Sequence, residues 1–272
     1  MIVRLVGDRA DRVVVALSGL WTFGPPSSWL TVHDFSTGRR GNEFPTPPDG
    51  SAVIALAADG ATLAMVAEGP SIRLIDLASG RTRAIALGTS RKDGEIGGVD
   101  FSPDGAALAV AIEANPVLLL NVVSGKEQGR IGIDNRSRPG ILKFSPNGRV
   151  LAVAGEDASG GATSVRLVEI ATGREQVRLV HRADISALAF SPDGTILATG
   201  TEDSLEDRDF AVRLWNVADG RKRAEVPGHR NSVTGLSFSA DGARLVSSSL
   251  DGTALIWDVP SLLRSPPKAP PD

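Results

Sequence analysis

The sequence predicts an all-β fold, and two observations carry that prediction. First, a five-residue motif recurs along the chain: FSPDG at 101–105 returns as FSPNG at 144–148, FSPDG at 190–194 and FSADG at 238–242. Second, short runs in which apolar residues alternate with small or polar ones lie between these motifs, for example at 185–190, and such alternation is typical of strands. A repeat of 42–48 residues built from short strands indicates a β-propeller with one four-stranded blade per repeat.

The composition is that of a globular protein and excludes several function classes. The 272 residues are 42% hydrophobic and 22% charged, and the absence of cysteine excludes disulfides and thiolate chemistry. A formal net charge of −3 provides no general attraction to nucleic acid or acidic lipid, so neither is expected as a partner. Without an apolar run of the roughly 20 residues that span a bilayer, and with charges near the N-terminus, we expect a cytoplasmic protein. The 24 Arg against 5 Lys suggest a GC-rich, bacterial genome.

Two landmarks define each blade in order along the chain. The Pro-Asp-Gly turn is expected between the first two strands, where Gly can adopt a positive φ, and the Phe before it ends the first strand. The second landmark is an apolar run, a polar residue and a turn that ends in Gly and a base; it occurs at 33–39, 75–81, 120–126, 168–174 and 215–221, and a sixth copy at 257–259 lacks its Gly. These copies predict blades at about 1–45, 46–88, 89–133, 134–180, 181–226 and 227–260, followed by a Pro-rich disordered tail or linker at 261–272.

The last two repeats resemble a known family. Gly228-His229, separated by 27 residues from Trp257-Asp258, resembles the Gly-His…Trp-Asp signature of the WD-repeat family, and His181 with Trp215 form a similar copy. The earlier copies depart from the signature, because the Trp position holds His33, Ile75, Leu120 and Val168. The resemblance covers residues 1–260 and implies a propeller that serves as a rigid platform for protein–protein interaction.

The family resemblance also implies a buried hydrogen-bonded tetrad in each of the last two blades. In the last blade its members are His229, Ser247, Asp251 and Trp257. In the fifth blade they are His181, Thr199, Asp203 and Trp215, with Asp209 as an alternative to Asp203. His229, Ser247 and Asp251 are also the residue types of a hydrolase triad, but Ser247 lacks the Gly-x-Ser-x-Gly turn that exposes a nucleophile. The structural tetrad is therefore favoured, and no catalytic residue is assigned.

No cofactor or metal is expected. Three His without Cys do not suit a zinc cluster, and the acidic loop at 202–209 lacks the alternate spacing and the Gly of a calcium loop. The innermost strands are mostly apolar or small, interrupted by Arg4, Asp100 and Lys143, which are too few for a metal cage.

Loops provide the candidate binding surface, because loops on a rigid scaffold commonly carry function. By family resemblance, the loops that enter each blade share one face with the turns between its second and third strands. The candidate contact residues there are Arg91, Lys92, Arg136, Arg138, Arg182, Arg230, Glu202 and Asp207. Trp21 and Phe23, in the long loop of the first repeat, are candidate aromatic anchors, and Trp29 is expected to begin the third strand of that blade.

The last blade is expected to have an open edge. The first strand of the chain would begin near Ile2 with no spare strand before it, and the sequence after Trp257-Asp258 has little strand character. An unpaired edge invites another chain, including a second copy of this protein. Our prediction is a non-catalytic scaffold for an unidentified protein partner, which could be a module of a larger regulatory protein. The alternatives are a propeller enzyme, or a ligand-sensing propeller with a site at the central channel.

Overall fold

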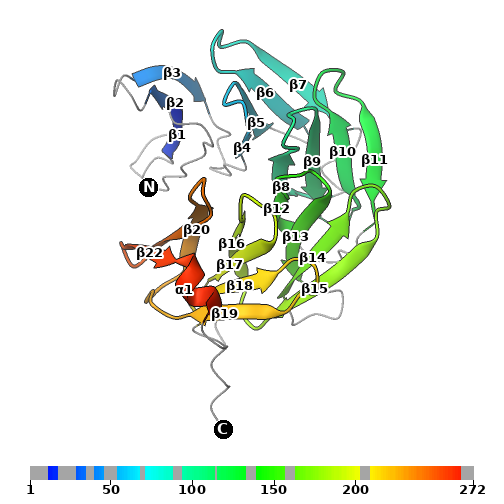
Figure 1. Cartoon of the computed structure of the whole chain (residues 1–272). Helices are drawn as coiled ribbons and strands as arrows, with labels where there is room; N and C mark the ends of the chain where they lie inside the picture. The colour runs from blue at the N-terminus through cyan, green and yellow to red at the C-terminus, as the bar shows by residue number, and fades with distance from the viewer. Residues whose placement is uncertain are drawn as a thin grey trace. The chain divides into compact units, whose positions relative to one another are not determined.

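The computed structural model describes residues 12–17, 29–34, 40–45, 54–67, 71–87, 94–113, 115–132, 139–156, 163–202 and 209–264. Within these ranges 22 strands form six antiparallel sheets, and a short helix follows the last strand (Figure 1). The chain forms two compact units. Unit 1 contains Met1–Glu113 and Val117–Gly129, and unit 2 contains Ala114–Pro116 and Arg130–Asp272. The predicted all-β fold is confirmed.

Three sheets come first in the chain and belong to unit 1, apart from the last two residues of β11, which are counted in unit 2. The first is β1 (Arg12–Leu17), β2 (Trp29–Asp34) and β3 (Arg40–Pro45); the second is β4 (Ile54–Leu56), β5 (Thr62–Ala67), β6 (Ser71–Asp76) and β7 (Thr82–Ala86); the third is β8 (Ile96–Phe101), β9 (Ala107–Ile112), β10 (Val117–Asn121) and β11 (Glu127–Ile131). Neighbours in each sheet are neighbours in sequence, so each sheet is a meander of hairpins. A strand does begin at Trp29, as expected, whereas the strand predicted near Ile2 lies outside the described residues.

Unit 2 contains the other three sheets, built in the same way. They are β12 (Pro139–Phe144), β13 (Val150–Glu156), β14 (Thr163–Glu169) and β15 (Glu175–His181); β16 (Ile185–Phe190), β17 (Ile196–Thr201), β18 (Val212–Asn216) and β19 (Lys222–Val226); and β20 (Val233–Phe238), β21 (Arg244–Ser249) and β22 (Ala254–Asp258). Among the described residues the last sheet has three strands, and whether the last blade is incomplete stays a prediction.

The repeated FSPDG-like motif forms the turn between the first and second strands of a blade. Strands β8, β12, β16 and β20 all end at the Phe of the motif, as predicted. In the third sheet the Ser102 hydroxyl donates to Asp104 Oδ1 at 2.6 Å, and Asp104 Oδ1 also accepts the N–H of Ala106 at 3.0 Å. Gly105 has a φ of 69°, which L side chains rarely adopt. The motif recurs because each such turn needs the same two hydrogen-bonding side chains and the same Gly.

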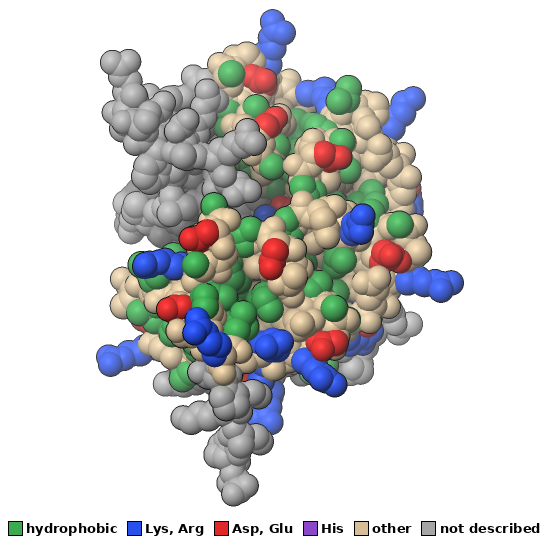
Figure 2. All heavy atoms as spheres, viewed as in Figure 1, with side chains coloured by type: hydrophobic (Ala, Val, Ile, Leu, Met, Phe, Trp, Pro, Cys, Tyr) green, Lys and Arg blue, Asp and Glu red, His purple; other side chains and the backbone are tan. Residues whose placement is uncertain are grey.

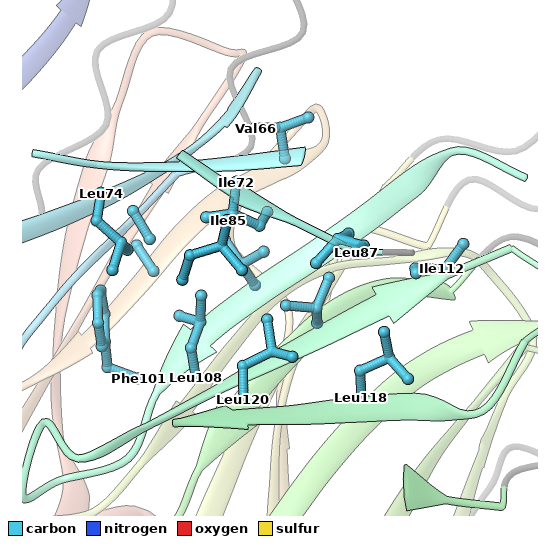
Figure 3. Packing of buried hydrophobic residues seen from close by; sticks show 14 of the residues in the cluster. Val66, Ile72, Leu74, Ile85, Leu87, Phe101, Leu108, Ile112, Leu118 and Leu120 are labelled. Atoms are coloured by element: carbon cyan, nitrogen blue, oxygen red, sulfur yellow. The ribbon is translucent and has the colours of Figure 1, made fainter. Parts of the chain in front are cut away.

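Apolar residues on facing sheets make up the core of each unit. In unit 1, Ile72, Leu74 and Ile85 of the second sheet point toward Phe101, Leu108 and Leu120 of the third sheet (Figure 3). In unit 2, one cluster joins the sheets β12–β15 and β16–β19, and another joins β16–β19 to β20–β22. The first strands of neighbouring sheets, such as β16 and β20, lie side by side. Stacked sheets of this kind bury both faces of an internal blade.

Helix α1 (Val259–Arg264) follows β22 directly and corrects one prediction. The sequence predicts a Pro-rich disordered tail or linker at 261–272; residues 261–264 belong to this helix and are not disordered, and residues 265–272 lie outside the described residues. Asp258 Oδ1 accepts the N–H of Ser261 at 3.3 Å and so caps the helix start, while Pro260 suits its first turn. Leu262 and Leu263 pack against the cluster between the last two sheets, and this tertiary contact stabilises a helix too short to be stable alone.

Candidate interaction surface

A chain of hydrogen bonds runs through the last sheet from Trp257 to Asp251. Trp257 Nε1 donates to Ser247 Oγ at 2.8 Å, and Ser247 Oγ lies 2.7 Å from His229 Nε2. His229 Nδ1 lies 3.3 Å from Asp251 Oδ2. With the Ser247 hydroxyl donating to His229 Nε2, Nδ1 carries the hydrogen, and both Asp251 Oδ2 and Thr253 Oγ1, at 3.2 Å, can accept it. The structure thus brings together all four residues that were predicted for this blade.

Burial separates this network from a hydrolytic triad. Ser247 is fully buried, and His229 is buried as well. A nucleophilic serine must reach a substrate carbonyl, whereas Ser247 is fully buried and its hydroxyl is already bonded to Trp257 and His229. The network therefore holds strands β21 and β22 and the loop before β20 together.

Asp251 anchors the loop side of the network. Its Oδ2 accepts the N–H of Arg230 at 2.8 Å, and its Oδ1 accepts the Thr253 hydroxyl at 2.6 Å and the Thr253 N–H at 2.8 Å. These donors, with the Thr253 hydroxyl first and His229 among them, hold the pKa of Asp251 well below its usual range. The charged carboxylate therefore ties the loop that enters the last blade to the turn between β21 and β22.

The fifth blade has a shorter version of the network. Trp215 Nε1 donates to Thr199 Oγ1 at 3.0 Å, and Thr199 Oγ1 lies 2.9 Å from His181 Nε2. His181 Nδ1 faces the carbonyl oxygen of Leu179 at 3.1 Å, so it donates to the backbone. The rings of His181 and Trp215 pack with their centroids 5.1 Å apart. Burial lowers the pKa of His181 to about 4, which keeps the imidazole neutral.

Asp209, the alternative carboxylate for this blade, contacts other groups, and Asp203 stays a prediction. Asp209, one of the two alternatives, forms an ion pair with Arg213, and its Oδ1 accepts the N–H of Ala211 at 3.2 Å. Asp203, the other alternative, lies outside the described residues. The Leu179 carbonyl takes the Nδ1 hydrogen because β15 continues to His181 and brings its own backbone beside the ring.

The loop that enters a blade does lie beside the turn between its second and third strands. The N–H of Glu202 donates to the carbonyl of Asp184 at 2.8 Å, and the N–H of Leu250 donates to that of Ser232 at 3.0 Å. The same contact joins Glu113 to Glu95 in the third sheet at 2.9 Å. These bonds fix the two kinds of loop at one edge of each sheet, which we call the loop edge.

Three of the candidate contact residues are described, and all three are exposed at the loop edge: Arg182, Glu202 and Arg230. Burial, and then the nearby charge of Asp184, raise the pKa of Glu202. Trp21, Phe23, Arg91, Lys92, Arg136, Arg138 and Asp207 lie outside the described residues. The face shown in Figure 2 carries scattered acidic, basic and hydrophobic side chains.

A group of apolar side chains on the last sheet is exposed, which the sequence did not predict. Val246 is 39% exposed, Leu250 64% and Ile256 65%. Strand β22 carries the sequence ALIWD, and the apolar residue Ile256 stands where the fifth blade has Leu214, which is fully buried. Alignment of the two repeats could have identified Ile256 as an apolar residue at a position that is buried in the fifth blade.

The regular four-stranded sheets, their stacked apolar faces and the inward-facing hydrogen-bond networks define a repeat protein of the β-propeller class. The model of the WD domain, G-beta repeat, matches residues 174–216 and 220–258, which contain His181 with Trp215 and His229 with Trp257. The chain therefore contains WD40 repeats at 174–216 and 220–258.

Curated relatives match short parts of the chain. Periodic tryptophan protein 2 homolog of Schizosaccharomyces pombe is 32% identical over 78 residues, which cover 29% of this chain and 8% of that protein. Small ribosomal subunit protein RACK1y of Oryza sativa is 35% identical over 51 residues, 19% of this chain and 15% of that protein. Telomerase protein component 1 of Rattus norvegicus is 30% identical over 118 residues, 42% of this chain and 4% of that protein. In each case the match spans a small part of the relative.

A solved structure supports the fold over nearly the whole chain. Kuenenia stuttgartiensis hydrazine synthase superposes with a TM-score of 0.73 over 96% of this chain and 78% of that chain, at 18% sequence identity. Identity at this level supports the shared fold and carries no chemistry. Among the described residues, no helix is long and apolar enough to cross a membrane.

Proposed function

We propose that this protein is a non-catalytic WD-repeat scaffold that binds a protein partner at its loop edge. WD40-repeat domains typically act as protein-interaction scaffolds. The proposal rests on the contrast between the polar side chains that are buried in the networks and the charged side chains that remain exposed. The Ser, His and Asp side chains of the described network in the last blade bond to other groups of the protein, while Arg182 and Arg230 stand exposed on loops beside the buried His of their blades.

Arg182 and Arg230 are the residues on which the proposal can be tested. Each follows the buried His of its blade, so its backbone is fixed by the network, while its side chain is exposed. Arg side chains held on rigid backbone are frequent hot spots, because little entropy is lost when they bind a carboxylate. An acidic segment of a partner protein fits this pair.

The test compares partners retained by tagged wild-type protein and by the variant Arg182→Glu with Arg230→Glu, in extracts of the source cells. Partners bound at the loop edge should fall at least fivefold in quantitative mass spectrometry, because charge reversal turns attraction into repulsion. The matched control reverses Arg174 and Arg221, which are exposed in the turns between third and fourth strands. Equal losses for both variants, or none for either, would contradict the proposal once equal melting temperatures show that both are folded.

We further propose a cytoplasmic location in a bacterial cell, and a place for this propeller within a larger regulatory protein. The first rests on the composition, and the second on the curated relatives, which are all much longer than the matched repeats. Cell fractionation with an immunoblot tests both. A band near 28.3 kDa would exclude the larger protein, and a signal in the membrane or secreted fraction would exclude the location.

A further inference from the structure

Three charged side chains stand at the loop edge of the fifth and last blades. Arg182 and Arg230 occupy equivalent positions, because each lies eight residues before the Phe that ends the first strand of its blade. Glu202 directly follows β17, where the turn toward β18 begins. All three residues are exposed, and all three belong to unit 2.

A backbone hydrogen bond places Glu202 beside the loop that carries Arg182. The N–H of Glu202 donates to the carbonyl of Asp184 at 2.8 Å, and Asp184 lies two residues after Arg182. Asp184 is itself held from the preceding blade, since its Oδ1 accepts the hydroxyl of Thr163 at 2.7 Å. The backbone on both sides of this contact is therefore fixed.

Packing between the fifth and last blades places Glu202 beside the loop that carries Arg230 as well. Gly200 lies against Val233 of β20, because a Cβ added to Gly200 would stand 2.5 Å from Val233 Cγ1. Glu202 continues the alternation two residues later, so it lies on the side of β17 that faces the last blade. The Ser186 hydroxyl donates to the carbonyl of Val233 at 2.5 Å and joins the two blades at this level. The order across the loop edge is therefore base, acid, base.

These three charges are not neutralised within the described part of the protein. There, neither Glu202 nor the two Arg side chains form a hydrogen bond or an ion pair; the backbone N–H groups of Glu202 and Arg230 are the groups that are bonded. Charges on the strands do form pairs, as Arg178 does with Glu175 at 2.8 Å. Burial and the charge of Asp184 raise the pKa of Glu202, which a cation beside the carboxylate would oppose.

We propose that this part of the loop edge binds an extended partner segment in which a basic residue stands between two acidic ones, and that Glu202 selects the basic residue. The inference rests on the proposed scaffold function and names the chemistry of its partner. The two acids pair with Arg182 and Arg230, and the base pairs with Glu202. A polyacidic or phosphorylated segment is rejected, because it brings negative charge to Glu202.

The fold also predicts the spacing of the three partner residues. Arg182 and Arg230 stand on neighbouring stacked sheets, and such sheets are roughly 10 Å apart. In an extended segment alternate side chains point to the same side, and four residues span roughly 13 Å. A sequence of the form acid-x-base-x-acid therefore presents all three charges to the loop edge, and the long Arg side chains accommodate the difference in length.

The first test selects peptides from a phage library with five random residues between Gly-Ser spacers on the immobilised full chain. The wild-type protein should enrich an acidic, a basic and an acidic residue at alternate positions. Glu202→Lys should enrich an acid at the middle position instead, because the charge that selects it is reversed. Asp219→Lys is the matched control; it makes the same charge change in an exposed turn between the third and fourth strands and should select as wild type.

Fluorescence anisotropy of two peptides with the same composition provides the second test. The wild-type protein should bind GSDSRSDSG roughly fivefold or more tightly than GSDSDSRSG, in which the base no longer stands between the acids. Glu202→Lys should remove this difference and should bind the all-acidic GSDSDSDSG most tightly. Equal melting temperatures of the variants exclude a loss of folding as the cause.

The outcomes separate the role of Glu202 from the scaffold function. No enrichment by the wild-type protein, or the same selection by Glu202→Lys, would overturn the inference. Selection of acids at all three positions, lost in the variant with Arg182→Glu and Arg230→Glu, would reject the role of Glu202 and leave binding at the loop edge supported. Selection that depends on none of the three charges would contradict both proposals.

Discussion

Replacing Thr199 by valine tests whether the inner network contributes to stability. Thr199 is fully buried, and its hydroxyl accepts the Trp215 N–H at 3.0 Å and lies 2.9 Å from His181 Nε2. Valine has nearly the same shape, so the change removes two hydrogen bonds without opening a cavity. Each buried polar group left without a partner costs roughly 1–3 kcal/mol, and the two together predict a loss of about 2–6 kcal/mol. For a chain of this size, such a loss lowers the melting temperature by on the order of 10 °C.

Thermal unfolding and urea titration of the full chain measure this loss, with Thr199→Ser as the matched control. Serine keeps the hydroxyl and removes one methyl group, which costs about 1 kcal/mol. In the background of Trp215→Phe, the cost of Thr199→Val should fall by about half, because the indole N–H that would lose its hydrogen-bond partner is then absent. The reasoning is refuted if Thr199→Val is as stable as Thr199→Ser, or if its cost is the same in both backgrounds.

Three further predictions concern pH, the loop anchor and the packing between blades. The pKa of His181 falls from 6.5 to about 4 on folding, so the unfolded chain binds the proton first. The contribution of neutral His181 to the free energy of unfolding is complete above pH 6.5 and is lost as the pH falls toward 4, by about 3 kcal/mol in all. Urea unfolding at pH 7 and pH 4.5 should show this loss of stability. The variant His181→Gln should reduce the difference between the two pH values. Asp251→Ala should lower the melting temperature without creating or removing catalysis, since four donors lose their acceptor; an unchanged midpoint would contradict it. Gly200→Ala places a Cβ 2.5 Å from Val233 Cγ1 and should cost roughly 1–3 kcal/mol in calorimetry, whereas Gly129→Ala, with open space around it, should cost less.

Local chemistry explains why so much of the fold was predictable. The turn after Phe101 needs a Ser hydroxyl, an Asp carboxylate and a Gly within five residues, so its position can be predicted from the sequence. The tetrad residues His229, Ser247 and Trp257 occupy fixed places in strand and loop, and their meeting follows from the hairpin register. The carbonyl partner of His181 was not predictable, because any backbone oxygen can replace a carboxylate and leaves no signature in the sequence.

The sequence by itself determined the repeat period, the ends of the first strands and the two Trp-containing networks, because each depends on contacts within one hairpin or one blade. The tertiary structure alone decided which apolar side chains are covered. Leu214 and Ile256 occupy equivalent positions in their strands and have similar side chains, yet one is fully buried and the other 65% exposed. Leu214 is buried because it packs in one cluster with Val233 and Leu245 of the next sheet in the same unit, and no single strand encodes such a neighbour.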